Sequence, residues 1–146
     1  MLALAAELGP IDRGARDVLA AVEAQTAHTR RIRTMIRAGD AIASRPYTYG
    51  GGHGSFTAGG YDCSGSVSYV LHAGGLLQAP ADSGGLTSYG LPGRGRHVSI
   101  YANAQHAFMT IDGRRYDTIA FQQSGTRWSS QIGSTAGYVV RHPAGL

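Results

Sequence analysis

The amino-acid sequence predicts an α+β fold in which helices come first and an antiparallel sheet follows. Apolar residues recur at helical spacing up to about residue 73, whereas from residue 97 onward several segments alternate apolar and polar residues at every second position. A glycine-rich stretch over residues 47–62 interrupts the helical part. Because runs of helices followed by runs of strands are typical of α+β proteins, we expect helices packed on one sheet.

Two helices are expected before the glycine-rich stretch. Residues 11–27 are rich in alanine and carry Val18, Leu19 and Val22 at helical spacing. A second helix should end before Pro46, because the residue before a proline disfavours helical geometry. This second helix is indicated by an apolar stripe opposite a run of arginines, formed by Ile32, Met35, Ile36, Ile42 and Ala43.

A third helix is expected over about residues 63–73, directly after the glycine-rich loop. Asp62 is a residue type that caps helix N-termini, and the pair Gly74-Gly75 should end the helix. Residues 79–96 contain prolines and several glycines and are interpreted as an irregular connection. The strands then follow, and their expected ranges are 97–102, 106–111, 114–119 and 136–142.

Composition indicates a folded globular chain. Its 146 residues correspond to one ordinary domain, and 42% of them are hydrophobic against 15% charged. All 13 basic residues are arginine, and the net charge of +4 favours anionic surroundings. The densest basic run, around residues 30–37, is interpreted as a solvated helix face, and no nucleic-acid-binding motif is found. The chain has no apolar run of membrane-spanning length and no signal peptide at its start.

Cys63 is the single cysteine, so it cannot form a disulfide within the chain. At the first turn of its helix, unpaired backbone N–H groups and the helix dipole favour the thiolate, which is the nucleophilic form. The glycines that precede it permit the close backbone approach that the wall of a cleft requires. A plain alternative stands beside this one: Cys63 shares a helix face with Val67, Val70 and Leu71, and it can equally be the first residue of a core stripe.

A nucleophilic thiol needs a base, and the base needs an orienting group. The Asp112-Gly113 pair predicts a two-residue hairpin turn that sets Ile111 opposite Arg114. In that register Phe108 faces Asp117 and His106 faces Ile119, so His106 and Asp117 lie on the same face of neighbouring strands, offset by one pair. A carboxylate behind an imidazole fixes its tautomer and stabilises its protonated form. Cys63, His106 and Asp117 therefore form a coherent set.

His97 competes with His106 for the role of base. A four-residue loop over 102–105 would set Tyr101 opposite His106 and His97 opposite Thr110, about 13 Å along the strand from His106 and farther from the acid. His106 is preferred because it has the carboxylate partner. His53, inside the glycine-rich loop, either touches substrate or pins the loop. No short-range ligand spacing supports a zinc site.

The segments PYTYGGGHGSFTAGGYDCSGSVSYVLHAGGLL, HAFMTI and RRYDT resemble the NlpC/P60 cysteine peptidases of bacterial cell walls, over about residues 32–142. The resemblance implies a papain-like core in residues 29–146, preceded by an N-terminal helical extension in residues 1–28. It also implies cleavage of peptide bonds in peptidoglycan stems, commonly between D-glutamate and the diamino acid, without a metal or organic cofactor.

The same resemblance implies roles for individual residues. Cys63 matches the nucleophile, a histidine that opens a central strand matches the base, and Asp117 matches the polar residue on the next strand. Tyr47 matches the tyrosine that helps to stabilise the oxyanion, whereas Asp62 and Ser64 match positions on the substrate side. Many members carry the base in a stretch similar to HVSIY, which begins at His97 here, but the chain is closer to a subgroup with YANAxHxFM and R-x-D-T, in which His106 is the base.

The sequence therefore predicts a monomeric peptidoglycan endopeptidase that works outside the cell or in the wall, although the chain carries no signal peptide. Its partner would be a peptidoglycan peptide, with no nucleic acid and no membrane span. Two alternatives remain open. One is an amidase or acyltransferase of the same fold with a substrate outside the wall, and the other is a non-catalytic wall-binding module.

Overall fold

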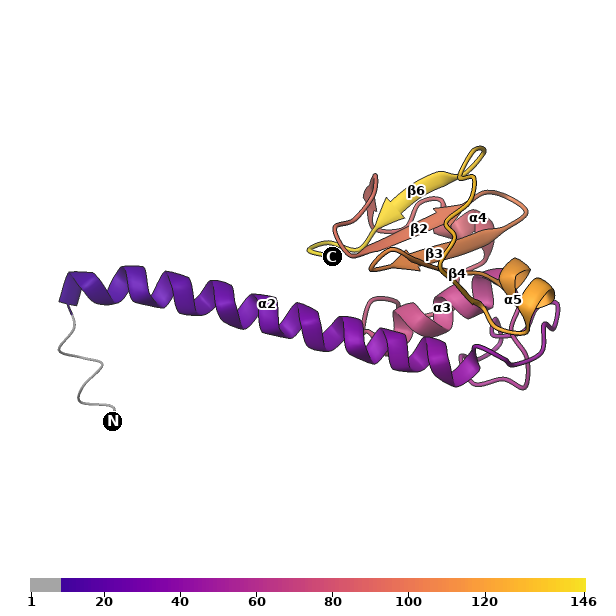
Figure 1. The fold of residues 1–146 in the computed structure, drawn as a ribbon, viewed down its shortest axis with the longest axis horizontal. Helices are drawn as coiled ribbons and strands as arrows, with labels where there is room; N and C mark the ends of the chain where they lie inside the picture. The colour runs from indigo at the N-terminus through magenta and orange to yellow at the C-terminus, as the bar shows by residue number, and fades with distance from the viewer. Residues whose placement is uncertain (1–8) are drawn as a thin grey trace. The chain divides into compact units, whose positions relative to one another are not determined.

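The computed structural model describes residues 9–146 (Figure 1). The chain divides into two compact units between Arg30 and Arg31. The described part of the first unit is helical, and the second unit holds the sheet, the remaining helices and the loops between them. Within the described residues, no helix is both long enough and apolar enough to cross a membrane.

The first helix, α2, runs from Gly9 to Ile42 without interruption, so the expectation of two separate helices was wrong. No glycine or proline lies between residues 15 and 38, and nothing in that stretch stops the helix. Close packing explains the glycine at position 39, because a Cβ atom there would lie only 2.7 Å from the ring of Trp128. α2 ends at Ile42, before Pro46 as expected.

The apolar residues of α2 differ in burial along its length. Ile32, Met35 and Ile42 are buried, as the stripe predicted. Val18, Leu19 and Val22 instead stand 65%, 57% and 55% exposed. Helical spacing predicted the backbone of this first stretch correctly but not a buried face.

Helix α3 covers Cys63–Ala73 and has the predicted bounds (Figure 1). The Oδ1 atom of Asp62 accepts a hydrogen bond from the Gly65 amide at 2.7 Å, which makes Asp62 the N-cap. At the other end the Gly74 amide donates back to the Val70 carbonyl, and Gly75 continues the chain at φ 72°, where glycine carries no steric penalty.

Six strands form one antiparallel sheet among the described residues, which confirms the α+β class. The spatial order is β1-β6-β2-β3-β4-β5. β1, β5 and the short helix α4, Ser83–Leu86, were not predicted, because segments of two to four residues are too short to show a period. The strands are β1 Leu91–Pro92, β2 Val98–Ala102, β3 Ala107–Ile111, β4 Arg114–Tyr116, β5 Trp128–Ser129 and β6 Val139–His142.

The β3–β4 hairpin turns at Asp112-Gly113 as predicted. Both turn residues have positive φ, 47° and 80°, and Ile111 pairs with Arg114. β4 is shorter than expected, however, because it ends at Tyr116 and the chain enters helix α5, Thr118–Ser124. Asp117 causes this change, since its side chain accepts from the Ile119 amide and caps α5. The predicted pairing of His106 with Ile119 is therefore wrong.

The predicted β2–β3 register was also wrong, by two residues. Tyr101 pairs with Phe108, not with His106, and His97 lies next to Asp112 instead of Thr110. The side chain of Asn103 explains the difference, because its Oδ1 accepts from the amides of Gln105 and His106 and closes a tight turn. β3 consequently begins at Ala107, one residue after His106.

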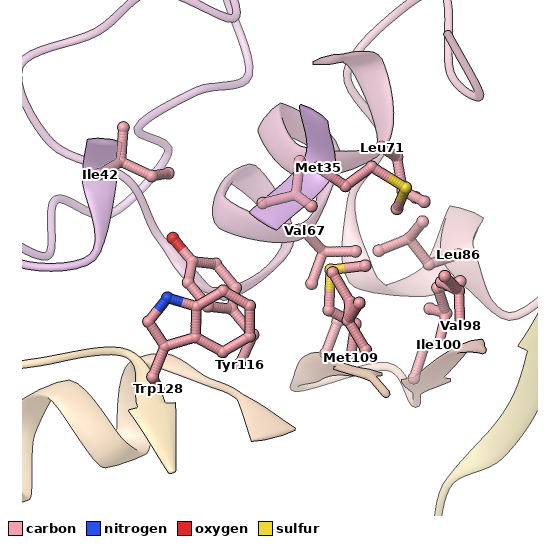
Figure 2. Close-up of a cluster of buried hydrophobic side chains, with 14 of the residues drawn as sticks. Met35, Ile42, Val67, Leu71, Leu86, Val98, Ile100, Met109, Tyr116 and Trp128 are labelled. Carbon is pink, nitrogen blue, oxygen red and sulfur yellow. The ribbon is translucent and has the colours of Figure 1, made fainter. Parts of the chain in front are cut away.

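The core of the second unit lies between one face of the sheet, α3, α4 and the end of α2 (Figure 2). Side chains at alternate positions of β2 and β3, such as Ile100 and Met109, point toward Val67 and Leu71 of α3. The opposite face of the same strands carries Ser99, Tyr101, Phe108 and Thr110, and by the same alternation His106 and Asp117.

Candidate active site

Cys63 begins α3 and lies at the edge of the core. It is 9% exposed, and its Sγ atom lies 3.5 Å from the Oγ atom of Ser83 at the start of α4. The thiol also forms a side-chain hydrogen bond with His106. Cys63 is thus buried, as the core interpretation requires, but it also lines an open pocket and has a polar partner, so it is not an ordinary core thiol.

His106 is held between the thiol and a carboxylate. Its Nε2 atom lies 2.8 Å from Oδ1 of Asp117, which leaves Nδ1 as the ring nitrogen for Cys63. The His106 amide donates to Oδ1 of Asn103 at 2.8 Å, so the turn before β3 fixes the backbone from which the imidazole projects.

Asp117 is 2% exposed, and both of its carboxylate oxygens have partners. Oδ1 accepts from His106 and from the Ile119 amide, whereas Oδ2 accepts from Nε of Arg115 at 2.8 Å. The guanidinium of Arg115 lies 3.5 Å from the ring centre of Phe108 and also donates to the carbonyl of Ile132. The acid is therefore fixed from two sides, and a buried charge is compensated.

The charges of the pair follow from these contacts. Burial raises the pKa of the Cys63 thiol, but hydrogen bonds with His106, with Ser83 and at the Ala107 backbone outweigh it and lower the pKa to about 7. Burial lowers the pKa of His106, but its bonds with Asp117 and Cys63 raise it to about 9. Between these values thiolate and imidazolium coexist, which is the reactive form of such a pair.

The pKa of Asp117 stays below its ordinary value. Burial acts in the opposite direction, but the hydrogen bond from His106, the Ile119 amide and the charge of the imidazolium outweigh it, with a further contribution from Arg115. At neutral pH the carboxylate is consequently ionised while the imidazole carries its proton.

The thiol opens into a pocket of about 430 Å³. The glycine-rich loop forms one wall, α4 a second and the turn before β3 a third. Its side chains are mainly polar and include two carboxylates near the thiol. The lining residues are Tyr47, Tyr49, Gly50, His53, Asp62, Cys63, Ser64, Asp82, Ser83, Gly84, Ala104 and Gln105.

The three predicted substrate-side residues lie together in this pocket. His53 Nε2 is 2.8 Å from Oδ1 of Asp62 and 3.1 Å from Oγ of Ser64. Asp62 also accepts from the Gly50 amide at 3.1 Å, so it ties the loop to the start of α3. His53 is thus tied to the first turn of α3 and also lines the pocket, and its contact with substrate stays a prediction.

Close backbone approach explains one glycine of α3. A Cβ atom on Gly65 would overlap the carbonyl oxygen of Gly51. The loop can therefore lie directly against the first turn of α3 only because Gly65 has no side chain.

Two hydrogen-bond donors lie beside the thiol. Tyr47 is 41% exposed and lines the pocket, and its pKa is raised by burial and by the neighbouring charges of Cys63 and Asp62, so the phenol keeps its proton. The amide of Cys63, at the first turn of α3, has no protein acceptor among the described residues. Tyr47 and Cys63 both line the pocket into which the thiol opens.

His97 lies at the far end of β2 and has its own acid. Its Nδ1 atom is 2.8 Å from Oδ1 of Asp112, and it does not line the pocket that holds Cys63. Of the two histidines, the structure brings His106 to the thiol and leaves His97 at the opposite end of the β2–β3 pair.

Three site residues were not predicted from the sequence. Ser83 lies in a segment that shows no periodic pattern in the sequence. Arg115 could have been found, because it precedes Asp117 by two residues and residues two apart on a strand share a face. Arg127 is fully buried and donates to the carbonyls of Ile42, Arg45 and Tyr61, and it also donates to Oγ of Ser66. Its own carbonyl accepts from the Asp117 amide, so one residue supports both the loop and the acid.

Within the described residues, no cluster of three or more histidine, cysteine, aspartate or glutamate side chains is arranged to hold a metal ion. A comparison of the chain with protein-family models finds no matching family, and a comparison with curated proteins finds no match either.

Proposed function

We propose that this protein is a cysteine peptidase of the NlpC/P60 type, with a papain-like core, that hydrolyses peptide bonds in peptidoglycan stem peptides. The observation that carries the proposal is the connected set Cys63, His106 and Asp117, in which a thiol at a helix N-terminus is bonded to an imidazole and the imidazole to a buried carboxylate. The resemblance of the surrounding segments to that family supplies the substrate class.

In this mechanism the Cys63 thiolate attacks the carbonyl carbon of the scissile bond and forms the C–S bond. The carbonyl oxygen takes the negative charge, and the Cys63 amide and the Tyr47 hydroxyl donate hydrogen bonds to it. The imidazolium of His106 then gives its proton to the leaving amine as the C–N bond breaks, which leaves an acyl-enzyme.

Water completes the reaction. Neutral His106 takes a proton from water while the oxygen attacks the thioester, and the carboxylic acid leaves as the thiolate–imidazolium pair forms again. Asp117 holds the ring in the required orientation throughout, because its Oδ1 accepts from Nε2.

The lining of the pocket favours a peptide substrate that carries polar and cationic groups. Its volume of about 430 Å³ admits a few residues, and Asp62 and Asp82 supply negative charge at its wall. His53 and Ser64 complete the substrate side. We place the protein, as a monomer, outside the cell or in the wall, where this substrate occurs.

The decisive experiment is incubation of the intact protein and of Cys63→Ala with purified peptidoglycan, followed by mass analysis of the soluble products. Stem-peptide fragments released only by the intact protein are expected. An acylated acceptor in place of hydrolysed peptide would identify an acyltransferase instead. Equal release by Cys63→Ala would end the proposal, and absence of release with rapid alkylation of Cys63 would keep the nucleophile but reject the substrate.

A further inference from the structure

A second hollow lies on the outer face of the sheet, at the end of β2 remote from His106. Its volume is about 100 Å³, and none of its lining residues belongs to the pocket of Cys63. Its lining extends along β2 from His97 to Tyr101, and Tyr101 pairs with Phe108, two residues along the chain from His106. It is lined by Arg94, Gly95, Arg96, His97, Ser99, Tyr101, Thr110, Gly113 and Ile132.

The charged side chains of this hollow are mostly positive. Arg94 and Arg96 are exposed, and neither guanidinium has an ion-pair or hydrogen-bond partner among the described residues. The acid nearest to the hollow is Asp112, which is bonded to His97. The site has an excess of positive charge, because two guanidinium groups are unpaired and the one nearby carboxylate is already bonded to His97.

Three hydroxyl groups line the same hollow. Oγ of Ser99 accepts from the Gly95 amide at 3.0 Å, which leaves its own O–H to donate. The hydroxyls of Tyr101 and Thr110 have no protein partner in the part of the chain that the structure describes. The ring of Tyr101 stacks on Phe108 at 4.8 Å, so this side chain is held in place by packing.

We propose that this hollow is a phosphate-binding site, formed by Arg94 and Arg96 together with the hydroxyls of Ser99, Tyr101 and Thr110. Guanidinium groups bind phosphate oxygens in a bidentate way, and neutral hydroxyls complete such sites. The hollow offers more hydrogen-bond donors than the two oxygens of a carboxylate can accept from. A phosphate group has more oxygen lone pairs and suits this number of donors better. The volume admits one phosphate group and not a sugar ring.

The occupant is identified by its chemistry and not by its source. Free phosphate and a phosphodiester in an anionic polymer present the same oxygens to the two arginines. Because the hollow is separate from the pocket of Cys63, its binding of phosphate does not depend on the proposed peptidase activity.

The test is an NMR titration of the ¹⁵N-labelled chain with inorganic phosphate at constant ionic strength, since surface binding depends on salt. Saturable shifts of the Arg94 and Arg96 Nε–Hε signals are expected. R94Q/R96Q should lower the affinity about tenfold or more, because charge-assisted hydrogen bonds are lost. The matched control is R33Q/R37Q, which removes the same charge from two exposed arginines of α2 and should leave the affinity unchanged within about twofold.

A second variant tests the hydroxyls without changing charge. Thr110→Val keeps the shape of the side chain and should lower phosphate affinity about two- to fivefold, in line with the loss of one neutral hydrogen bond. Shifts that do not saturate, equal losses in the two double variants, or acetate binding as tightly as phosphate would each overturn the proposal. Dimethyl phosphate that binds as well as inorganic phosphate indicates a phosphodiester source, whereas its failure to bind indicates free phosphate, and both results uphold the site.

Discussion

Asp117→Asn gives the sharpest test of how the reactive thiol is produced. The substitution keeps the size of the side chain and an oxygen that accepts from Nε2 of His106 and from the Ile119 amide, so the cap of α5 is retained. It removes the negative charge behind the imidazolium, and it also replaces the oxygen that accepts from Arg115 with an NH2 group. We expect the pKa of His106 to fall and, with it, the stabilisation of the Cys63 thiolate to weaken.

The magnitude follows from the pKa values of the pair. The rise in the pKa of His106 from 6.5 to about 9 corresponds to about 3 kcal/mol in favour of the imidazolium. A thiol pKa of about 7 leaves about half of Cys63 as thiolate at neutral pH, whereas a return toward the ordinary value of 9.0 leaves about one part in a hundred. The rate of alkylation at pH 7 should therefore fall by about five- to fiftyfold.

The assay is the rate of iodoacetamide alkylation of Cys63 as a function of pH, which needs no substrate. In the unaltered protein the rate should rise through a midpoint near pH 7, and in Asp117→Asn the midpoint should move upward. The matched control is Asp112→Asn, which removes the acid from the other histidine–aspartate pair and should leave the curve unchanged. A folded Asp117→Asn protein whose midpoint stays near 7 would refute the role given to this carboxylate.

Three further outcomes are expected. Hydrolysis of stem peptides, measured as kcat/KM against pH, should rise as the thiol ionises near pH 7 and fall as the imidazolium loses its proton near pH 9; a curve that still climbs at pH 10 would contradict the assignment. Arg127→Leu should lower the free energy of unfolding in urea by about 3–5 kcal/mol, because several buried carbonyls lose their donor. The control Arg45→Gln, at an exposed side chain, should lower it by less than about 0.5 kcal/mol. Similar losses for the two variants would show that the buried contacts do not matter. Gly65→Ala should lower the free energy of unfolding by about 2 kcal/mol and slow the alkylation of Cys63, because the added methyl group meets the loop. The control is Gly54→Ala, which has open space around it. Equal stability of the two variants would argue against close packing of the loop on α3.

Local signals in the sequence predicted the part of the fold that carries the site. The cap at Asp62 and the glycine pair after residue 73 defined α3 to the residue, because both signals act within one helical turn. The Asp-Gly dipeptide located the β3–β4 turn, and counting positions from it brought His106 and Asp117 to one face. That count remained valid although Asp117 leaves the strand, since its backbone is still extended, at φ −156° and ψ 134°.

The features that could not be predicted depend on contacts between distant segments. Arg127 bonds to carbonyls as many as 85 residues earlier in the chain, and Ser83 meets a thiol 20 residues before it. Neither contact leaves a periodic pattern in the sequence. The β2–β3 register failed for a related reason, because it is decided by the side chain of Asn103 in the turn and not by the alternation of the strands.

The contacts of Arg127 also set an order of events during synthesis. Cys63 and the glycine-rich loop are made first, but the side chain that fixes the loop carbonyls at Arg45 and Tyr61 follows 82 and 66 residues after these two positions. Because the N-terminal part of a nascent chain emerges first, α3 can form long before its loop is anchored or His106 has its carboxylate. A growing or truncated chain that has not reached Asp117 and Arg127 therefore carries a thiol without the partners that lower its pKa.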